Sequence, residues 1–332
     1  MTKTAGVTLA GLTLCGLVAI VLPPPTLAAP LMTAGTGCNG PFGSTSGPGI
    51  VESSCDVTTA GTFSPNAGNL NTTAFSSAGP GFIKVRSQAQ VLALNVVSGF
   101  NLITAQASGE WLYNDFIIRG PTSSVLAALN LRLDGVVGNA VIHDDDGTLR
   151  SIAAGNAQFF IQIDLNGTVA GFGEIIRRNT NGVEAQTVDG LLVDKFGSDL
   201  ALSGLITSSE LTLPVGSIFS VHVLANVGAN ASGLISGSPA DEFDLTDVGA
   251  LATSDFSATV EFPKTGPVFV LPPGYTVESL SAGIANNRVV AVPQAASEPA
   301  ALFLLGTGLL SLLHVVALRR RGDAKQSARA TV

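Results

Sequence analysis

The stretch that decides the fold is residues 161–167, Ile-Gln-Ile-Asp-Leu-Asn-Gly. Its apolar residues Ile161, Ile163 and Leu165 alternate with polar ones, and successive side chains of a β-strand point to opposite faces. The pair Asn166-Gly167 follows, which favours a tight antiparallel turn because glycine accepts positive φ. The stretch therefore predicts a half-buried strand that ends in a hairpin.

The same period of two recurs along the chain from Phe82 onward. No long amphipathic helical pattern intervenes, which disfavours a parallel sheet with crossover helices. We therefore expect an all-β domain over residues 81–290, an antiparallel β-sandwich of which the jelly-roll is one form. The other alternating stretches are 83–86, 129–134, 219–223 and 258–262, and further turns are expected at Asp134-Gly135, Asp146-Gly147, Asn181-Gly182 and Asp189-Gly190.

Residues 29–80 differ from this pattern. They are rich in Gly, Ser, Thr, Asn and Pro with little apolar periodicity, which predicts a loop-heavy region. Cys38 and Cys55 lie in it, and in an exported protein such a pair most simply forms a disulfide. The alternative, a metal or redox site, lacks a nearby histidine and a C-x-x-C spacing.

The first 28 residues have the features of a secretory signal. Lys3 supplies a short positive region, residues 5–22 are apolar and uncharged, and three prolines end any helix there. Small residues before the expected cleavage point place it between Ala28 and Ala29. Signal peptidase is the implied partner.

The C-terminal segment, residues 291–332, has the features of a membrane anchor. Residues 300–318 form a 19-residue run without formal charge, which as a helix would span about 28 Å and could cross a bilayer once. Arg319, Arg320 and Arg321 follow, and the positive-inside rule keeps such a tail in the cytoplasm. The body would then lie outside the membrane.

The motif before this helix adds a family resemblance. The C-terminal segment resembles the PEP-CTERM sorting signal, because the apolar run and three arginines follow the stretch Val292-Pro-Gln-Ala-Ala-Ser-Glu-Pro299. Glu298 and Pro299 match two positions of the Pro-Glu-Pro motif, and Ser297 stands where the family has its first proline. The resemblance implies that an exosortase-like membrane enzyme processes the segment. It also implies a link to exopolysaccharide.

Charge excludes one class of partner. Six of the sixteen basic residues and one of the 24 acidic residues lie outside residues 29–298, which leaves that range with 10 basic and 23 acidic side chains, a net charge of -13. A surface this acidic would repel phosphate backbones, so we expect no nucleic-acid binding.

Two acidic clusters are weak candidates for a Ca²⁺ site. Carboxylates are preferred ligands of that ion, but the first cluster lacks the alternating spacing of an EF-hand. A solvated turn is the favoured interpretation of the first cluster, and no other cofactor is implied. The candidate ligands are Asp144, Asp145 and Asp146 in one cluster and Asp241, Asp244 and Asp247 in the other.

No catalytic constellation stands out. A serine hydrolase needs a histidine partner, and His143 and His222 are the histidines outside the terminal segments. We expect His222 to be exposed on the polar face of its strand. Gly43-Ser-Thr-Ser-Gly47 has threonine where a nucleophile elbow has serine, and Gly171-Phe-Gly173 lacks the third glycine of a dinucleotide-binding loop.

Trp111 and Tyr113 allow two interpretations, a small glycan platform on one strand face or ordinary core packing. The main functional expectation is an exported, non-enzymatic surface or extracellular-matrix protein, held at the membrane until it is processed. The alternative is a secreted protein that binds or cleaves polysaccharide.

Overall fold

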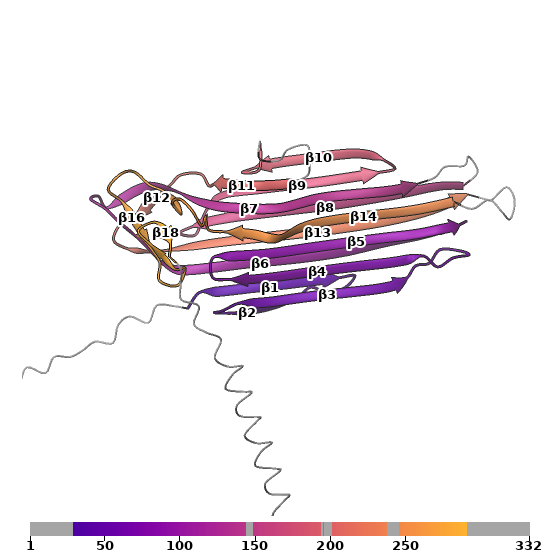
Figure 1. Cartoon of the computed structure of the whole chain (residues 1–332), viewed down its shortest axis with the longest axis horizontal. Helices are drawn as coiled ribbons and strands as arrows, with labels where there is room; N and C mark the ends of the chain where they lie inside the picture. The colour runs from indigo at the N-terminus through magenta and orange to yellow at the C-terminus, as the bar shows by residue number, and fades with distance from the viewer. Residues whose placement is uncertain (1–28, 144–148, 194, 196–200, 238–245, 291–332) are drawn as a thin grey trace, which may run out of the picture.

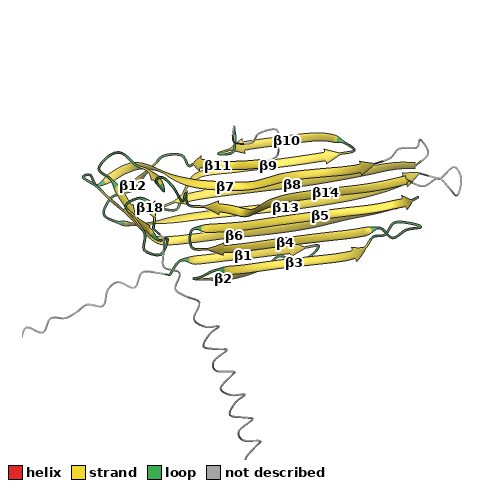
Figure 2. Cartoon of the chain, viewed as in Figure 1, coloured by secondary structure: helices red, strands yellow, loops and turns green. Residues whose placement is uncertain are grey.

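A computed structural model describes residues 29–290 apart from 144–148, 194, 196–200 and 238–245. The described residues form long antiparallel strands and contain no helix (Figure 2). Two eight-stranded sheets pack face to face, and a two-stranded ribbon lies beside them (Figure 1). The predicted antiparallel β-sandwich is therefore confirmed.

The first sheet has the strand order β10-β9-β8-β13-β6-β1-β2, with β16 paired to β6. Its strands are β1 (Leu31–Cys38), β2 (Gly43–Gly47), β6 (Gly99–Arg119), β8 (Leu149–Leu165), β9 (Thr168–Thr180), β10 (Val183–Gly190), β13 (Ile218–Gly237) and β16 (Thr276–Glu278).

The second sheet has the order β11-β7-β14-β5-β4-β3, with β12 and β15 paired to β7. Its strands are β3 (Val51–Ala60), β4 (Asn69–Gly79), β5 (Phe82–Val96), β7 (Ser124–His143), β11 (Ala201–Thr207), β12 (Leu211–Pro214), β14 (Thr246–Glu261) and β15 (Phe269–Val270). The ribbon pairs β17 (Ile284–Ala285) with β18 (Arg288–Val289).

The last two long strands complete both sheets. β13 lies between β6 and β8, and β14 lies between β5 and β7. Each therefore joins a strand of the first part of the chain to a strand of the middle part. Such distant pairings form only after most of the chain is available, which makes the fold rich in non-local contacts.

The core lies between the sheets and is built by the alternation. Ile161, Ile163 and Leu165 are fully buried. Trp111 and Tyr113 are fully buried too, with their ring centroids 5.3 Å apart, so they pack in the core and do not form a glycan platform. Burial of large apolar side chains of this kind is the main source of stability for such a domain.

The prediction of a loop-heavy region over residues 29–80 is wrong, because β1, β2, β3 and β4 lie there. Their buried positions carry small or hydroxyl-bearing side chains, for example Thr72, Ala74 and Ser76 in β4. These residues fit between closely packed sheets but give no apolar period in the sequence.

The predicted turns have mixed outcomes. Asn166-Gly167 and Asn181-Gly182 both adopt positive φ and connect β8 to β9 and β9 to β10, as predicted. Gly190, also with positive φ, ends β10. The prediction at Asp134-Gly135 is wrong, because this pair lies inside β7, where the ring of Phe256 occupies the space beside the glycine. Asp146-Gly147 lies outside the described residues.

Cys38 and Cys55 form the predicted disulfide, and it joins the two sheets. Cys38 ends β1 of the first sheet, and Cys55 lies in β3 of the second. The hydroxyls of Thr36 and Ser53 form a 2.8 Å hydrogen bond between the same two strands. This side of the sandwich is therefore held by one covalent and one polar cross-connection.

Replacing both cysteines by serine is expected to lower the free energy of unfolding by about 3 kcal/mol, because an open loop of this length gives the unfolded chain more entropy. The measurement is urea unfolding of both proteins with and without a reducing agent. The difference should disappear under reducing conditions. Equal stabilities under oxidising conditions would contradict the prediction.

Candidate functional site

The outer face of the second sheet carries a shallow groove between β4 and β5. Asn71, Thr73 and Phe75 of β4 and Arg86 and Gln88 of β5 line it, and its volume is about 310 Å³. Side chains alternate along each strand, so these five point away from the core while their neighbours point into it. Thr73 lies opposite Gln88 and Phe75 lies opposite Arg86, which places the five side chains side by side.

The groove has little net charge and one unused polar atom. Arg86 Nε lies 3.6 Å from Asp255 Oδ2 on β14, and its Nη2 donates to Gln88 Oε1 at 3.3 Å. Asn71 Oδ1 is buried and has no hydrogen-bond partner among the described residues. A buried acceptor without a partner costs free energy, so a rotation of the Asn71 side chain that brings this oxygen to a ligand donor would be favoured. The groove thus offers amide, hydroxyl and guanidinium groups beside one aromatic ring.

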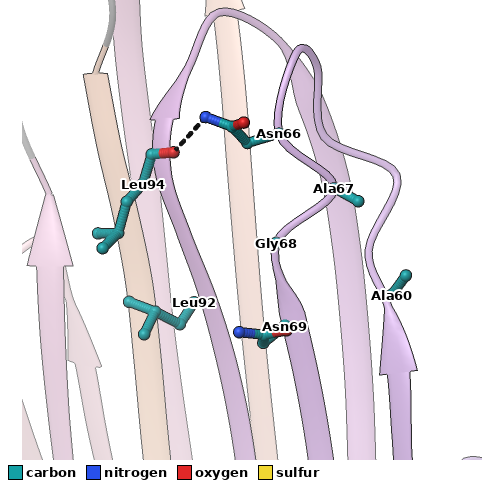
Figure 3. A pocket seen from close by; sticks show the side chains of 7 residues that line it. All are labelled: Ala60, Asn66, Ala67, Gly68, Asn69, Leu92 and Leu94. Atoms are coloured by element: carbon teal, nitrogen blue, oxygen red, sulfur yellow. Dashed lines mark hydrogen bonds between the residues drawn. The ribbon is translucent and has the colours of Figure 1, made fainter.

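A second cavity, of about 420 Å³, lies at one end of the sandwich (Figure 3). Its lining is mostly apolar and includes Leu92 and Leu94, which project from β5 in Figure 3. The Asn66 amide donates to the carbonyl oxygens of Leu94 at 3.2 Å and Asn95 at 2.9 Å. Because these bonds serve the loop itself, that amide has less capacity left for a ligand.

The outer face of the first sheet holds a polar row across three strands. His222 on β13 lies between Glu110 on β6 and Asp164 on β8. Its Nδ1 lies 3.0 Å from Asp164 Oδ2, and its Nε2 lies 3.4 Å from Glu110 Oε2. His222 lies on the outer, polar face of its strand as predicted, but its side chain is only 28% exposed because the two carboxylates flank it.

The two carboxylates perturb the titration of the histidine. The hydrogen bond from Glu110 raises the pKa of His222, partial burial opposes it, and Asp164 adds to the rise. The hydrogen bond to His222 in turn lowers the pKa of Glu110. The protonated imidazole and its two carboxylates therefore form a charged clamp that ties three strands together.

This clamp gives stability a defined pH dependence. The raised pKa of His222 contributes stability that is fully present below the unfolded value of 6.5 and is lost as the pH rises through the folded pKa. The lowered pKa of Glu110 contributes stability that is present above 4.5 and is lost as the pH falls through the folded pKa. The clamp is therefore strongest between these two values.

Replacing His222 by glutamine is expected to cost about 1 kcal/mol of unfolding free energy near pH 5.5, since the groups are partly solvated. The cost should shrink as the pH rises above the folded pKa of His222. Urea unfolding at a series of pH values measures it. His143 is exposed at the end of β7, so His143→Gln is the matched control. A cost that does not change with pH would contradict the assignment.

The described part of the chain holds no group of three or more His, Cys, Asp or Glu side chains arranged to bind a metal ion. The two nitrogens of His222 face different carboxylates, so these three groups do not converge on one point. Among the Ca²⁺ candidates, Asp247 accepts a hydrogen bond at Oδ1 from the backbone N–H of Asn95 at 2.8 Å. The other candidates, Asp144, Asp145, Asp146, Asp241 and Asp244, lie outside the described residues.

Gly171-Phe-Gly173 has a packing role. A Cβ atom at Gly171 would lie 2.8 Å from the Leu191 side chain, and one at Gly173 would lie 2.7 Å from Leu192. The glycines let the segment after β10 fold back, and Leu192 becomes fully buried. The residues of the processing signals, Ala28 and Ser297 to Arg321, fall outside the described part of the chain.

Sequence reasoning missed both the groove and the clamp. His222 is 58 residues from Asp164 and 112 from Glu110, so no local motif signals their contact. The groove side of β4 gives no local signal either, because the outward-facing Asn71, Thr73 and Phe75 alternate with buried residues such as Thr72 and Ala74 that are no more apolar than they are.

No known family model matches this chain, and no curated protein matches it significantly in sequence. Within the described ranges, no helix is long and apolar enough to cross a bilayer.

Proposed function

We propose that this chain is an exported, non-enzymatic surface or extracellular-matrix protein that is processed at both ends. The observation that carries the proposal is the Cys38–Cys55 bond between the two sheets. Disulfides persist in oxidising compartments and are rare in the cytosol, so this bond favours an extracytoplasmic location. The terminal sequence features support the same conclusion.

In this proposal signal peptidase removes a signal helix, residues 1–28. A single helix over residues 300–318 then anchors the protein, with Arg319 to Arg321 on the cytoplasmic side. An exosortase-like enzyme acts at Ser297-Glu298-Pro299 and releases or transfers the body. The sorting system's link to exopolysaccharide makes the extracellular matrix its expected destination.

The placement of the chain ends supports display away from a membrane. Leu31 pairs with Leu112, and Thr276 pairs with Arg119, so both ends of the described chain lie near the C-terminal end of β6 (Figure 1). β6 has 21 residues and spans roughly 66 Å at about 3.3 Å per residue. The opposite end of the sandwich is the part an anchored protein would present to its surroundings.

The test is to change the sorting motif in the native host. Replacing Glu298 and Pro299 by alanine should trap the protein in the membrane fraction, whereas Ser297→Pro should increase release. Ser327→Ala in the tail is the control and should behave as the unchanged protein. Immunoblots of membrane and medium measure the distribution. Equal release of the double variant and the unchanged protein would overturn the sorting proposal.

Polysaccharide binding is the second candidate function, and the groove between β4 and β5 favours it. Its amides, hydroxyl and aromatic ring suit a sugar chain. Cleavage would need two carboxylates facing each other across a substrate site. Glu110 and Asp164 instead hold His222 between them on an open sheet face, so we do not propose cleavage.

A further inference from the structure

We propose that the outer face of the second sheet, centred on the groove between β4 and β5, binds a neutral, hydroxyl-rich polysaccharide chain. This inference rests on the second candidate function and names its ligand class. It combines the shape of the surface, its aromatic ring, its unused acceptor and its charge.

The groove continues onto the neighbouring strands. Thr73 pairs with Asp56 of β3 on one side and with Gln88 of β5 on the other, and Gln88 pairs with Thr253 of β14. Asp56 is exposed, and Thr73, Gln88 and Thr253 are half-buried. Four adjacent strands, spaced about 4.8 Å apart, thus present short hydrogen-bonding side chains in one row. A row of donors and acceptors on an open face suits an extended chain of hydroxyl groups.

Phe75 supplies the apolar contact that a sugar ring needs. It is half-buried in the groove, directly opposite Arg86 on the next strand. An aromatic face contributes stacking energy beyond its buried area, and the C–H face of a pyranose ring can cover it. The planar guanidinium beside it can donate to ring hydroxyls at the same time.

Asn71 is a specific reason to expect a ligand with hydroxyl donors. Its Oδ1 is buried without a hydrogen-bond partner at the edge of the groove. Buried polar atoms are almost always paired, so a rotation of the Asn71 side chain that brings this oxygen to a ligand hydroxyl would supply the missing donor.

The charges of the groove and of the protein body favour a neutral polysaccharide over an anionic one. Arg86 lies against Asp255, so the cation of the groove is balanced. Asp56 flanks the row, and residues 29–298 carry a net charge of -13. An anionic polymer would therefore be repelled by the body and would find no free cation in the groove. A neutral polymer meets neither penalty.

The experiment is affinity electrophoresis of the protein recovered from its host, in native gels that contain a polysaccharide. The probes are dextran, galactomannan and the neutral fraction of the host's own extracellular polysaccharide, with alginate as the anionic comparison. We expect at least one neutral probe to retard the protein and alginate to leave its mobility unchanged.

Two groove variants locate the site. Phe75→Ala should weaken retardation about tenfold, the size expected for one lost stacking contact. Gln88→Ala should weaken it as well. The matched control is Phe172→Ala on β9, an exposed phenylalanine of the first sheet, which should bind as the unchanged protein does. Thermal melting of each variant checks that it is folded.

Retardation by no neutral probe would overturn the proposal. Retardation that Phe75→Ala and Gln88→Ala leave unchanged would also overturn it, because the ligand would then lie elsewhere. The outcome is separate from that of the sorting test. If the protein stays in the membrane fraction but binds a neutral polysaccharide through Phe75, the proposed release is wrong and the proposed binding site is supported.

Discussion

Replacing Ala225 by proline is expected to prevent the sandwich from folding. Ala225 is fully buried at the middle of β13, where it pairs with Gly109 of β6 and Ile161 of β8. Proline lacks the N–H group, and a strand with a partner on each side has no open edge toward which that group could point. The change also breaks the strand that joins β6 to β8. Circular dichroism and the yield of soluble protein measure the effect.

The matched control is the same change on an edge strand. Ala185 lies on β10, is exposed, and has a strand partner on one side, β9. Ala185→Pro should therefore fray β10 and leave the rest of the sandwich folded. If Ala225→Pro folds with the stability of Ala185→Pro, β13 does not have the central role assigned to it.

Replacing Asp115 by alanine is expected to cost about 3 kcal/mol of unfolding free energy, because buried hydrogen bonds to a carboxylate are lost together. Asp115 on β6 is 4% exposed. It accepts hydrogen bonds from Ser279 Oγ at 2.7 Å, Ser281 N at 2.8 Å and Ser281 Oγ at 2.6 Å. These bonds fasten the segment that contains β17 and β18 to the sandwich. Urea unfolding measures the global cost.

Limited proteolysis should show where the stability is lost. In Asp115→Ala, cleavage should begin within residues 276–290. Asp115→Asn should lose less unfolding free energy than Asp115→Ala, because it keeps one acceptor oxygen. The control is Glu278→Ala. Glu278 pairs with Arg119 on the surface, and exposed pairs contribute about 0.5 kcal/mol. Equal effects of Asp115→Ala and Glu278→Ala would show that Asp115 does not anchor this segment.

The strands that sequence reasoning found are those whose buried face is strongly apolar. Ile83 and Val85 are fully buried as predicted, and Arg86 is exposed. Asn130 is an exception on β7, since it is 3% exposed although its position in the alternation is polar. Its side-chain amide donates to the Pro267 carbonyl at 3.0 Å, and its Oδ1 accepts from Thr207 Oγ1 at 2.8 Å. Partners so distant in sequence cannot be predicted from a local pattern.

The order of the strands in each sheet could not be predicted from the sequence either, because the paired strands are distant in sequence. Alternation shows which face of a strand is buried, but it does not show which strands pair, so the insertion of β13 and β14 could not be derived from it. The disulfide could be predicted, because only two of the three cysteines, Cys38 and Cys55, follow the expected signal segment, and two allow one pairing. That it joins the two sheets could not, since β1 and β3 were not recognised as strands.

The central claim is that the chain is exported, oxidised and trimmed at both ends. The most direct test is the intact mass of the protein recovered from the culture medium of its host, measured without and with reduction. We predict a chain that begins at Ala29 and ends near Ser297-Glu298-Pro299, and that gains about two mass units on reduction of Cys38–Cys55. A chain that keeps its first 28 residues or its tail from Arg319 onward, found in the membrane with both cysteines reduced, would contradict the account.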